Sequence, residues 1–87
     1  MTSDEIFKLL QDVLVEHHDV PRDVIRRDTP ITDLGFDSLS MTEVTYQMEV
    51  RLGIPPEHDE PRRMPHTVGE AVDMIAAHMA ERAALTN

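Results

Sequence analysis

The positions of the prolines decide where helices can form in this chain. Val20-Pro21 and Pro30 interrupt the first half, and four more prolines fall between residues 55 and 65. Proline lacks a backbone donor and disfavours helical geometry in the residue before it, so a helix seldom continues through one. The long stretches without proline are residues 1–20, 31–54 and 66–87.

Each of these stretches carries apolar residues at the spacing of three and four that is typical of an amphipathic helix. We expect the first helix to run to about His17. The apolar positions are Ile6, Phe7, Leu9, Leu10, Val13 and Leu14 in the first stretch, Met41, Val44, Met48 and Leu52 in the second, and Val68, Val72, Ile75 and Met79 in the third. The pattern therefore predicts three helices, each with one buried face.

Residues that favour helix ends stand at the borders of these stretches. Thr2 with Glu5, and the run Thr67–Glu70, have the spacing of capping boxes, in which a hydroxyl and a carboxylate satisfy backbone donors. Asp37 is a favoured N-cap whose negative charge faces the positive end of the helix dipole. Gly53 is placed to end the second helix. The second helix should therefore begin at Asp37-Ser38.

The connections complete the predicted fold. Residues 19–36 form a long loop with a short helical turn near Pro21–Ile25, and the proline-rich residues 55–66 allow one turn of helix at most. Apolar residues of the long loop should hold it across the bundle: Val20, Val24, Ile25, Ile31, Leu34 and Phe36. We expect residues 1–87 to form one all-α domain of three main helices plus a short fourth element.

Charge and cysteine content exclude several classes of function. Seventeen Asp and Glu against eight Lys and Arg give a formal charge of −9, so we expect no nucleic-acid partner and instead protein partners with basic patches. The absence of cysteine rules out disulfides and thiolate catalysis. No apolar run or signal layout indicates a membrane segment. We therefore expect a cytoplasmic protein without stable membrane association.

The histidines do not predict a metal site. His17-His18 are adjacent and point in different directions on a helix, and His58, His66 and His78 lack a ligand spacing. We interpret all five as surface residues and expect no metal. No catalytic grouping is visible either, so the sequence does not predict an enzyme.

The most informative segment is Leu34-Gly35-Phe36-Asp37-Ser38-Leu39. It places a serine on the first turn of a predicted helix, where backbone donors and the dipole stabilise a phosphate by about 0.3–1 kcal/mol. By itself the pattern is explained most simply by a serine that starts a helix. The segment does not match the G-x-S-x-G nucleophile elbow, and no histidine is adjacent in sequence. Ser38 therefore has the character of a modified serine rather than a nucleophile.

With these residues the chain resembles the acyl carrier protein family, from the helix at Ile6–Leu14 to the run Thr67–Val72. Residues 34–39 match the family's attachment motif at every position. The resemblance implies that a phosphopantetheinyl transferase attaches 4'-phosphopantetheine from coenzyme A to Ser38, with Asp37 and Leu39 beside it. The thiol of that arm would carry acyl groups as thioesters, which explains thiol chemistry in a chain without cysteine.

The resemblance also implies a partner surface on the second helix of a monomeric carrier. The residues that correspond to it are Leu39, Glu43, Tyr46, Glu49 and Val50. The partners would be a ketosynthase, an acyltransferase and other pathway enzymes, which perform the chemistry. Exposed ion pairs contribute about 0–1 kcal/mol each, and such weak contacts suit a shuttle that leaves each enzyme quickly.

Polyketide and fatty acid biosynthesis both remain open. Thr42, Tyr46 and Val50 make the second helix less acidic than in carriers of bacterial fatty acid synthesis, which favours a dedicated pathway such as polyketide biosynthesis. Arg62-Arg63 and the surrounding prolines suggest that the family's short third helix is shortened or displaced. We also hypothesise a cavity for the acyl chain, bordered by Met41, Met48, Ile75 and Met79.

Two alternatives stay open. A peptidyl or aminoacyl carrier of a non-ribosomal peptide pathway usually has Gly-His or a similar pair before the serine, whereas this chain has Phe36-Asp37. An unmodified helical adaptor module, which is a different class of protein, would need neither Ser38 nor the transferase.

Overall fold

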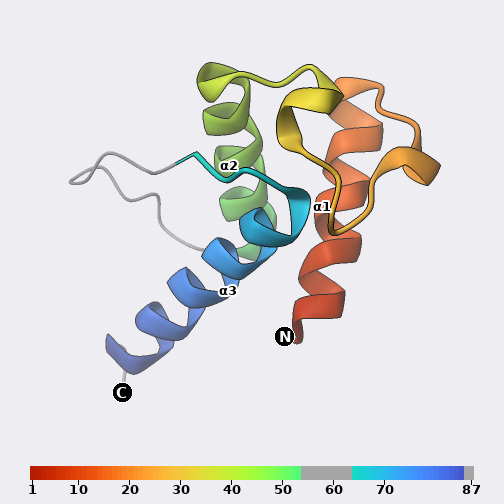
Figure 1. Cartoon of the computed structure of the whole chain (residues 1–87). Coiled ribbons are helices and arrows are strands. Elements are labelled where there is room, and N and C mark those ends of the chain that lie inside the picture. The colour runs from red at the N-terminus through yellow and green to blue at the C-terminus, as the bar shows by residue number, and fades with distance from the viewer. Residues whose placement is uncertain (54–63, 86–87) are drawn as a thin grey trace.

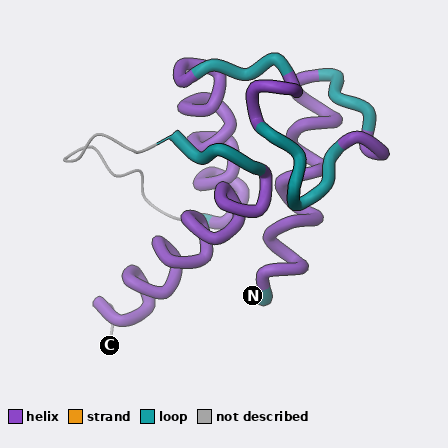
Figure 2. The backbone as a smooth tube through the Cα atoms, viewed as in Figure 1, coloured by secondary structure: helices purple, strands orange, loops and turns teal. Residues whose placement is uncertain are grey.

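The computed structural model describes residues 1–53 and 64–85, with side chains described as far as residue 81. These residues form α1 (Ser3–His18), α2 (Ser38–Leu52) and α3 (Val68–Leu85), with the 3₁₀ turns η1 (Arg22–Val24) and η2 (Ile31–Leu34) between α1 and α2 (Figures 1 and 2). No strand occurs among them. The prediction of an all-α fold with three main helices and a long first loop is confirmed. The predicted fourth element falls mostly on residues 54–63, outside the described residues.

The three predicted helix starts are confirmed in detail. The Thr2 hydroxyl accepts the backbone N–H of Glu5 at 3.2 Å, and the Glu5 carboxylate accepts that of Thr2 at 2.9 Å. Asp37 is the N-cap of α2. At α3 the Thr67 hydroxyl accepts the N–H of Glu70 at 3.1 Å. These contacts join residues at most three apart, so the sequence was sufficient to predict them.

The helix ends match the predictions at α2 and add a feature at α1. Gly53 ends α2 in the left-handed region, with φ 69°. The helix α1 runs to His18 and is closed by Asp19, which adopts φ 57° and donates its N–H to Leu14. Asp is one of the few non-glycine residues that tolerate this geometry. The reversal at Asp19 directs the chain into the long loop.

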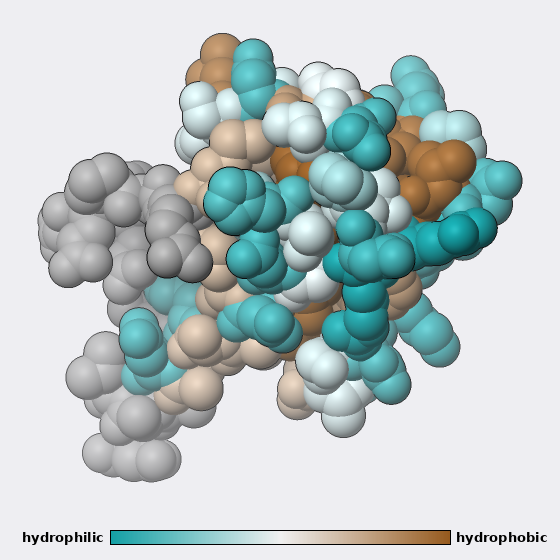
Figure 3. Space-filling model, in the orientation of Figure 1, coloured by the Kyte–Doolittle hydropathy of each residue, from teal (hydrophilic) through white to brown (hydrophobic). Residues whose placement is uncertain are grey.

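The core lies between the helices, with α1 packed against both α2 and α3. It is largely aliphatic and includes residues from α1, α2, α3, η2 and the loop segments beside them, but none from η1. Its buried members are Ile6, Leu10, Val13, Leu14, Val20, Ile25, Ile31, Phe36, Met41, Val44, Met48, Val68, Ala71 and Val72. On the outside, hydrophilic side chains cover much of the face drawn in Figure 3, as the acidic composition requires.

The long loop is held across the bundle by buried side chains and by backbone hydrogen bonds to the start of α3. As predicted, Val20, Ile25, Ile31 and Phe36 are buried, and Leu34 packs against them. The prediction for Val24 is wrong: it is 44% exposed, on the outer side of the η1 turn. Three backbone hydrogen bonds of 2.8–3.0 Å join the loop to the segment that begins α3. The N–H of Ile31 donates to the carbonyl oxygen of His66, the N–H of Val68 donates to that of Thr29, and the N–H of Gly69 donates to that of Arg27.

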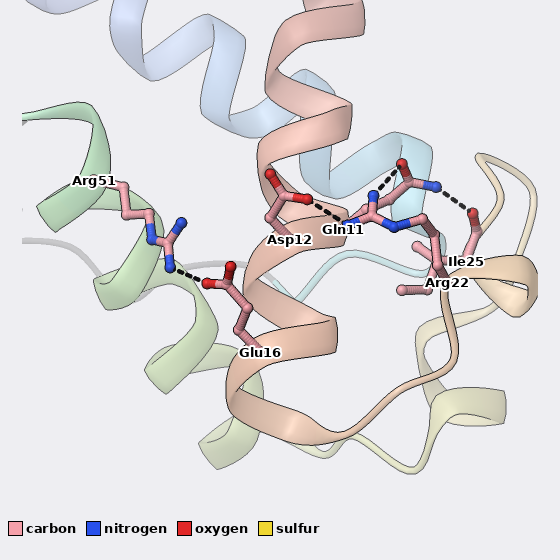
Figure 4. A network of polar contacts seen from close by, with 6 residues as sticks. All are labelled: Gln11, Asp12, Glu16, Arg22, Ile25 and Arg51. Carbon is pink, nitrogen blue, oxygen red and sulfur yellow. Dashed lines mark hydrogen bonds and ion pairs between the residues drawn. The ribbon is translucent and has the colours of Figure 1, made fainter.

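Polar contacts join the same loop to α1, and α1 to α2 (Figure 4). The side-chain N–H of Gln11 donates to the carbonyl oxygen of Ile25 at 3.0 Å. Arg22 forms an ion pair with Asp12, and Arg51 of α2 forms one with Glu16 of α1. All four charged side chains are at least about one-third exposed, so each pair contributes little to stability.

Candidate functional site

Ser38 is the first residue of α2 and is exposed. The turn before it is formed by Gly35, which ends η2 with φ 83°. This left-handed backbone conformation is strained for residues that carry a Cβ atom, whereas glycine adopts it readily. Phe36 then anchors the segment in the core, where the His18 ring meets it edge-on with ring centroids 5.2 Å apart. A fixed turn and a buried anchor thus present the serine on the surface at the start of a helix.

Asp37 caps α2 beside the serine. Its carboxylate accepts the backbone N–H of Ser40 at 2.8 Å, and this hydrogen bond lowers the pKa of Asp37. The Ser38 carbonyl accepts the hydroxyl of Thr42 at 2.8 Å. Among the described residues no side chain forms a hydrogen bond with the Ser38 hydroxyl. Within the described part of the chain no side chain is therefore placed to act as its general base, and the geometry fits a serine that another protein modifies.

The surroundings of Ser38 fit a covalently attached phosphate. An exposed primary hydroxyl can form a phosphodiester, and the helix start offers backbone donors and the positive end of the dipole. Asp37 already satisfies one of these donors, the N–H of Ser40. Ser38 also lies on the wall of a cavity, so a group attached there would begin at the cavity's edge.

The cavity has a volume of about 190 Å³ and lies between α2 and α3. Of the four residues hypothesised to border an acyl cavity, Met41, Met48 and Ile75 line it. The expectation for Met79 is corrected: it packs against the hydrophobic core instead. The remaining lining residues are Leu10, Ser38, Thr42, Val44, Thr45, Glu49, Leu52, Met64, Pro65, Ala71, Met74 and His78. Four of the six methionines therefore lie in this wall, which suits a space that can widen.

Four of the five predicted partner residues share one exposed stripe of α2. Leu39, Tyr46 and Val50 are 70%, 57% and 62% exposed, and Glu43 is exposed as well. Their spacing of four, three and four residues keeps them on one side of the helix. We name these four residues the α2 stripe. Its large apolar side chains are unusual on a surface and begin next to Ser38.

Glu49 does not belong to the α2 stripe, and the expectation of a surface acid there is corrected. It is 6% exposed and lines the cavity. A signal was present in the sequence, because Glu49 lies four residues after Thr45 and eight after Met41, on the buried side of the helix. Its carboxylate oxygen Oε2 lies 3.9 Å from Nε2 of His78.

His78 is likewise not the surface residue expected. Its side chain is 14% exposed and lines the cavity from α3. It follows Met74 and Ile75 by four and three residues, so the three share one side of α3. The contact with Glu49 joins positions 29 residues apart and therefore has no local signature in the sequence.

Neither a metal site nor a membrane-spanning helix is present in the part of the chain that the structure describes. No group of three or more His, Asp or Glu side chains there could hold an ion. None of the described helices is both long and apolar enough to cross a bilayer.

Comparison with known proteins gives consistent results. The profile of the family described as "Phosphopantetheine attachment site" matches residues 6–59, a segment that includes Ser38. Proteins named acyl carrier protein are similar along most of the chain. The acyl carrier protein of Lactobacillus johnsonii is 34% identical, and the alignment covers 90% of this chain and 98% of that protein. The acyl carrier protein of Lactobacillus acidophilus is 33% identical, and the alignment covers 90% of this chain and 98% of that protein. The one from Acidothermus cellulolyticus is 35% identical, and the alignment covers 87% of this chain and 90% of that protein.

Proposed function

Because this chain belongs to the phosphopantetheine-attachment family and to the acyl carrier proteins within it, we propose that Ser38 is the residue that bears its prosthetic group. The group is 4'-phosphopantetheine, bound covalently, whose terminal thiol carries acyl chains as thioesters. The protein thus acts as a carrier rather than a catalyst. We further propose the surface that partner enzymes contact and the pathway that the carrier serves.

The observation that supports Ser38 is its position. It is exposed at the first residue of α2, after a turn fixed by Gly35 and beside the capping carboxylate of Asp37. Leu39 follows as an exposed apolar residue that a modifying enzyme can contact. We propose that Asp37 and Leu39 help to position the arm or the transferase that attaches it.

Intact-protein mass spectrometry tests the attachment site. The protein is incubated with coenzyme A and a phosphopantetheinyl transferase, and it should gain the mass of one phosphopantetheine group. Ser38→Ala should gain nothing. Ser3→Ala is the matched control, because Ser3 is also an exposed first residue of a helix, and it should load like the unchanged protein. Loading of Ser38→Ala would refute the site, and absence of loading in every variant would favour an unmodified adaptor.

We propose that the α2 stripe is the surface that partner enzymes contact. Those partners are the transferase, a ketosynthase, an acyltransferase and other enzymes of the pathway. The exposed apolar side chains of Leu39, Tyr46 and Val50 can enter pockets on a partner. Glu43 and the net charge of −9 would steer the approach of basic surfaces.

Polyketide biosynthesis is the pathway we favour over fatty acid synthesis. The outward side of α2 presents Tyr46 and Val50 rather than a continuous acidic surface. Reconstitution with a ketosynthase from each pathway tests this: the matching enzyme should accept the loaded carrier with the higher kcat/KM. Preferential loading by an amino-acid-activating enzyme would instead support a peptidyl carrier.

The cellular state of the carrier is part of the same proposal. We propose that residues 1–87 act as a single carrier domain that is monomeric and cytoplasmic and binds no nucleic acid. Light scattering at several concentrations tests the monomer, and a single cooperative unfolding transition tests the single domain. A mass that rises with concentration would contradict the monomer.

A further inference from the structure

His18, in the last turn of α1, contacts the chain on both sides of Ser38. Its ring meets the ring of Phe36, two residues before the serine, with centroids 5.2 Å apart and planes at 75°. Its Nε2 lies 3.0 Å from the side-chain oxygen Oε1 of Gln47, nine residues after the serine on α2. One half-buried side chain of α1 therefore bridges the turn that precedes α2 and the body of α2 itself.

The bridge uses both properties of an imidazole ring. An edge-to-face arrangement is favourable for two rings, and Phe36 is otherwise buried in the core. Because the acceptor on Gln47 is an amide oxygen, the hydrogen bond is donated by the N–H at Nε2 of His18. An aliphatic side chain could pack without donating, and an amide could donate without presenting a ring. Histidine does both from one position.

The other contacts of α2 leave its first turn dependent on this bridge. In the described part of the chain, the polar side-chain contacts between α2 and other elements fall in its second half, at Gln47, Glu49 and Arg51. The hydroxyls of Thr42 and Thr45 donate to carbonyl oxygens of α2 itself. The turn that carries the serine is therefore held from in front of the helix, through the aromatic side chain on which the histidine ring packs.

We propose that His18 is a positioning residue for the loading of Ser38. By joining Phe36 to Gln47 it holds the turn before α2 in the geometry that the phosphopantetheinyl transferase binds. The inference rests on the proposed attachment at Ser38, and it adds a residue that lies outside the attachment motif, twenty positions earlier in the chain.

The effect of the bridge should appear in the KM for the carrier rather than in kcat. Without the bridge the turn exchanges between conformations, and the apparent affinity of the transferase falls with the fraction of carrier in the competent one. Once the complex has formed, the transferase itself holds the turn, so the rate of phosphopantetheine transfer within the complex is unchanged. A higher KM at constant kcat is the signature of a lost contribution to binding alone.

Steady-state loading with coenzyme A, followed by intact-protein mass, tests the proposal. His18→Leu should raise the KM for the carrier about fivefold, as expected for the net loss of one hydrogen bond, and leave kcat unchanged. His18→Phe keeps a ring against Phe36 and His18→Gln keeps an N–H donor, so each should raise KM less. His17→Leu, the same change at the adjacent exposed histidine, should alter neither constant. An unchanged KM in His18→Leu, or a lower kcat alone, would overturn the proposal.

A double-mutant cycle tests whether the two side chains act as one unit. His18→Phe removes the donor, and Gln47→Met removes the acceptor at similar size. If the hydrogen bond between them carries the effect, the combined variant should have about the same KM as either single variant. Additive increases would show that the side chains act separately, and they would overturn the bridge.

Val72→Ala separates positioning from general loss of stability. Val72 is fully buried in α3, so the substitution leaves a cavity in the core and lowers the free energy of unfolding without touching the bridge. Its KM should equal that of the unchanged protein at a temperature where both are folded. A rise in KM as large as that of His18→Leu would make destabilisation the cause and refute a positioning role.

Amide hydrogen exchange tests the bridge without the transferase. The N–H groups of Gly35 and Ser40, on either side of the serine, are both hydrogen-bonded. In His18→Leu their exchange should accelerate about fivefold relative to that of Ala71, whose N–H is bonded at the start of α3. Equal acceleration at all three positions would overturn the bridge. If the transferase instead loads Ser38→Ala, the attachment proposal is wrong, while the exchange rates still decide on the bridge.

Discussion

The backbone N–H of Gly69 donates to the carbonyl oxygen of Arg27 at 2.8 Å, and this contact brings the first turn of α3 against the loop between α1 and α2. The approach is so close that a Cβ atom on Gly69 would lie 2.9 Å from the same oxygen. Backbone cannot give way as a flexible side chain can. The loop that leads to Ser38 is therefore held by a contact that requires glycine in α3.

We expect Gly69→Ala to destabilise the protein by about 1–3 kcal/mol, because the added methyl group forces the helix and the loop apart. In an exposed helix the same change would stabilise by about 0.5–1 kcal/mol. Urea denaturation measures the difference. Asp73→Ala, an exposed substitution in the same helix, is the control and should stay within about 0.5 kcal/mol of the unchanged protein. An equal or greater stability of Gly69→Ala would contradict the close approach.

Gly35 provides a different test, since its requirement is conformational. Its φ is 83°, and nothing lies within 4 Å of the position that a Cβ would occupy. Gly35→Ala should therefore cost about 1–2 kcal/mol through backbone strain alone, and Gly35→Asn should cost less because Asn tolerates the left-handed region. Denaturant midpoints of the two variants give the comparison. Equal stabilities would show that the turn before Ser38 relaxes to another geometry.

The features that could be predicted from the sequence are those that nearby residues determine. The capping contacts of Thr2 with Glu5 and of Thr67 with Glu70 span three residues, and the buried stripes repeat every three or four. The family motif placed Ser38 at a helix start, and the structure has it there. Local chemistry was sufficient for each of these predictions.

What the sequence did not predict depends on contacts between distant positions. The spacing of Glu49 already puts it on the buried side of α2, but its contact with His78 across the cavity arises only from the approach of α2 to α3. Val24 is apolar yet exposed, whereas the adjacent Ile25 is buried, and nothing in the local sequence distinguishes the two. Met64 lines the cavity from near the end of the proline-rich stretch, where no periodicity indicates which side faces inward.

The caps of α1 and α2 predict how stability depends on pH. Hydrogen bonds from the backbone of Thr2 and of Ser40 lower the pKa of Glu5 and of Asp37 respectively in the folded protein. A lowered folded pKa means that the contribution is present above the ordinary carboxyl range and is lost as pH falls through the folded value. Stability should therefore decrease below about pH 4.

The substitution Asp37→Asn isolates one of these groups, since Asn also caps helices but does not titrate in this range. The variant should be less stable than the unchanged protein at neutral pH, and the difference should shrink as pH falls. Thermal unfolding at a series of pH values measures it. A difference that stays constant down to the most acidic condition would show that the Asp37 carboxylate has no role in the cap.

The α2 stripe predicts a loss of binding without a loss of stability. Tyr46 is 57% exposed, so Tyr46→Ala should change the free energy of unfolding by less than about 0.5 kcal/mol. If Tyr46 enters a pocket on a partner, its removal should weaken the complex by more than about 1 kcal/mol, or roughly fivefold. The kcat/KM of transferase loading would report the effect on that enzyme, and titration with a ketosynthase would report it on another.

Val24→Ala is the matched control, because Val24 is also an exposed apolar residue but lies on η1, away from α2. It should leave both measurements unchanged. If the two substitutions reduced loading equally, the effect would come from general surface apolarity rather than from the stripe. If neither substitution reduced loading, Tyr46 would not contact the transferase or the ketosynthase. Leu39 and Glu43, the residues of the α2 stripe nearest to Ser38 in the sequence, would then be the next to replace.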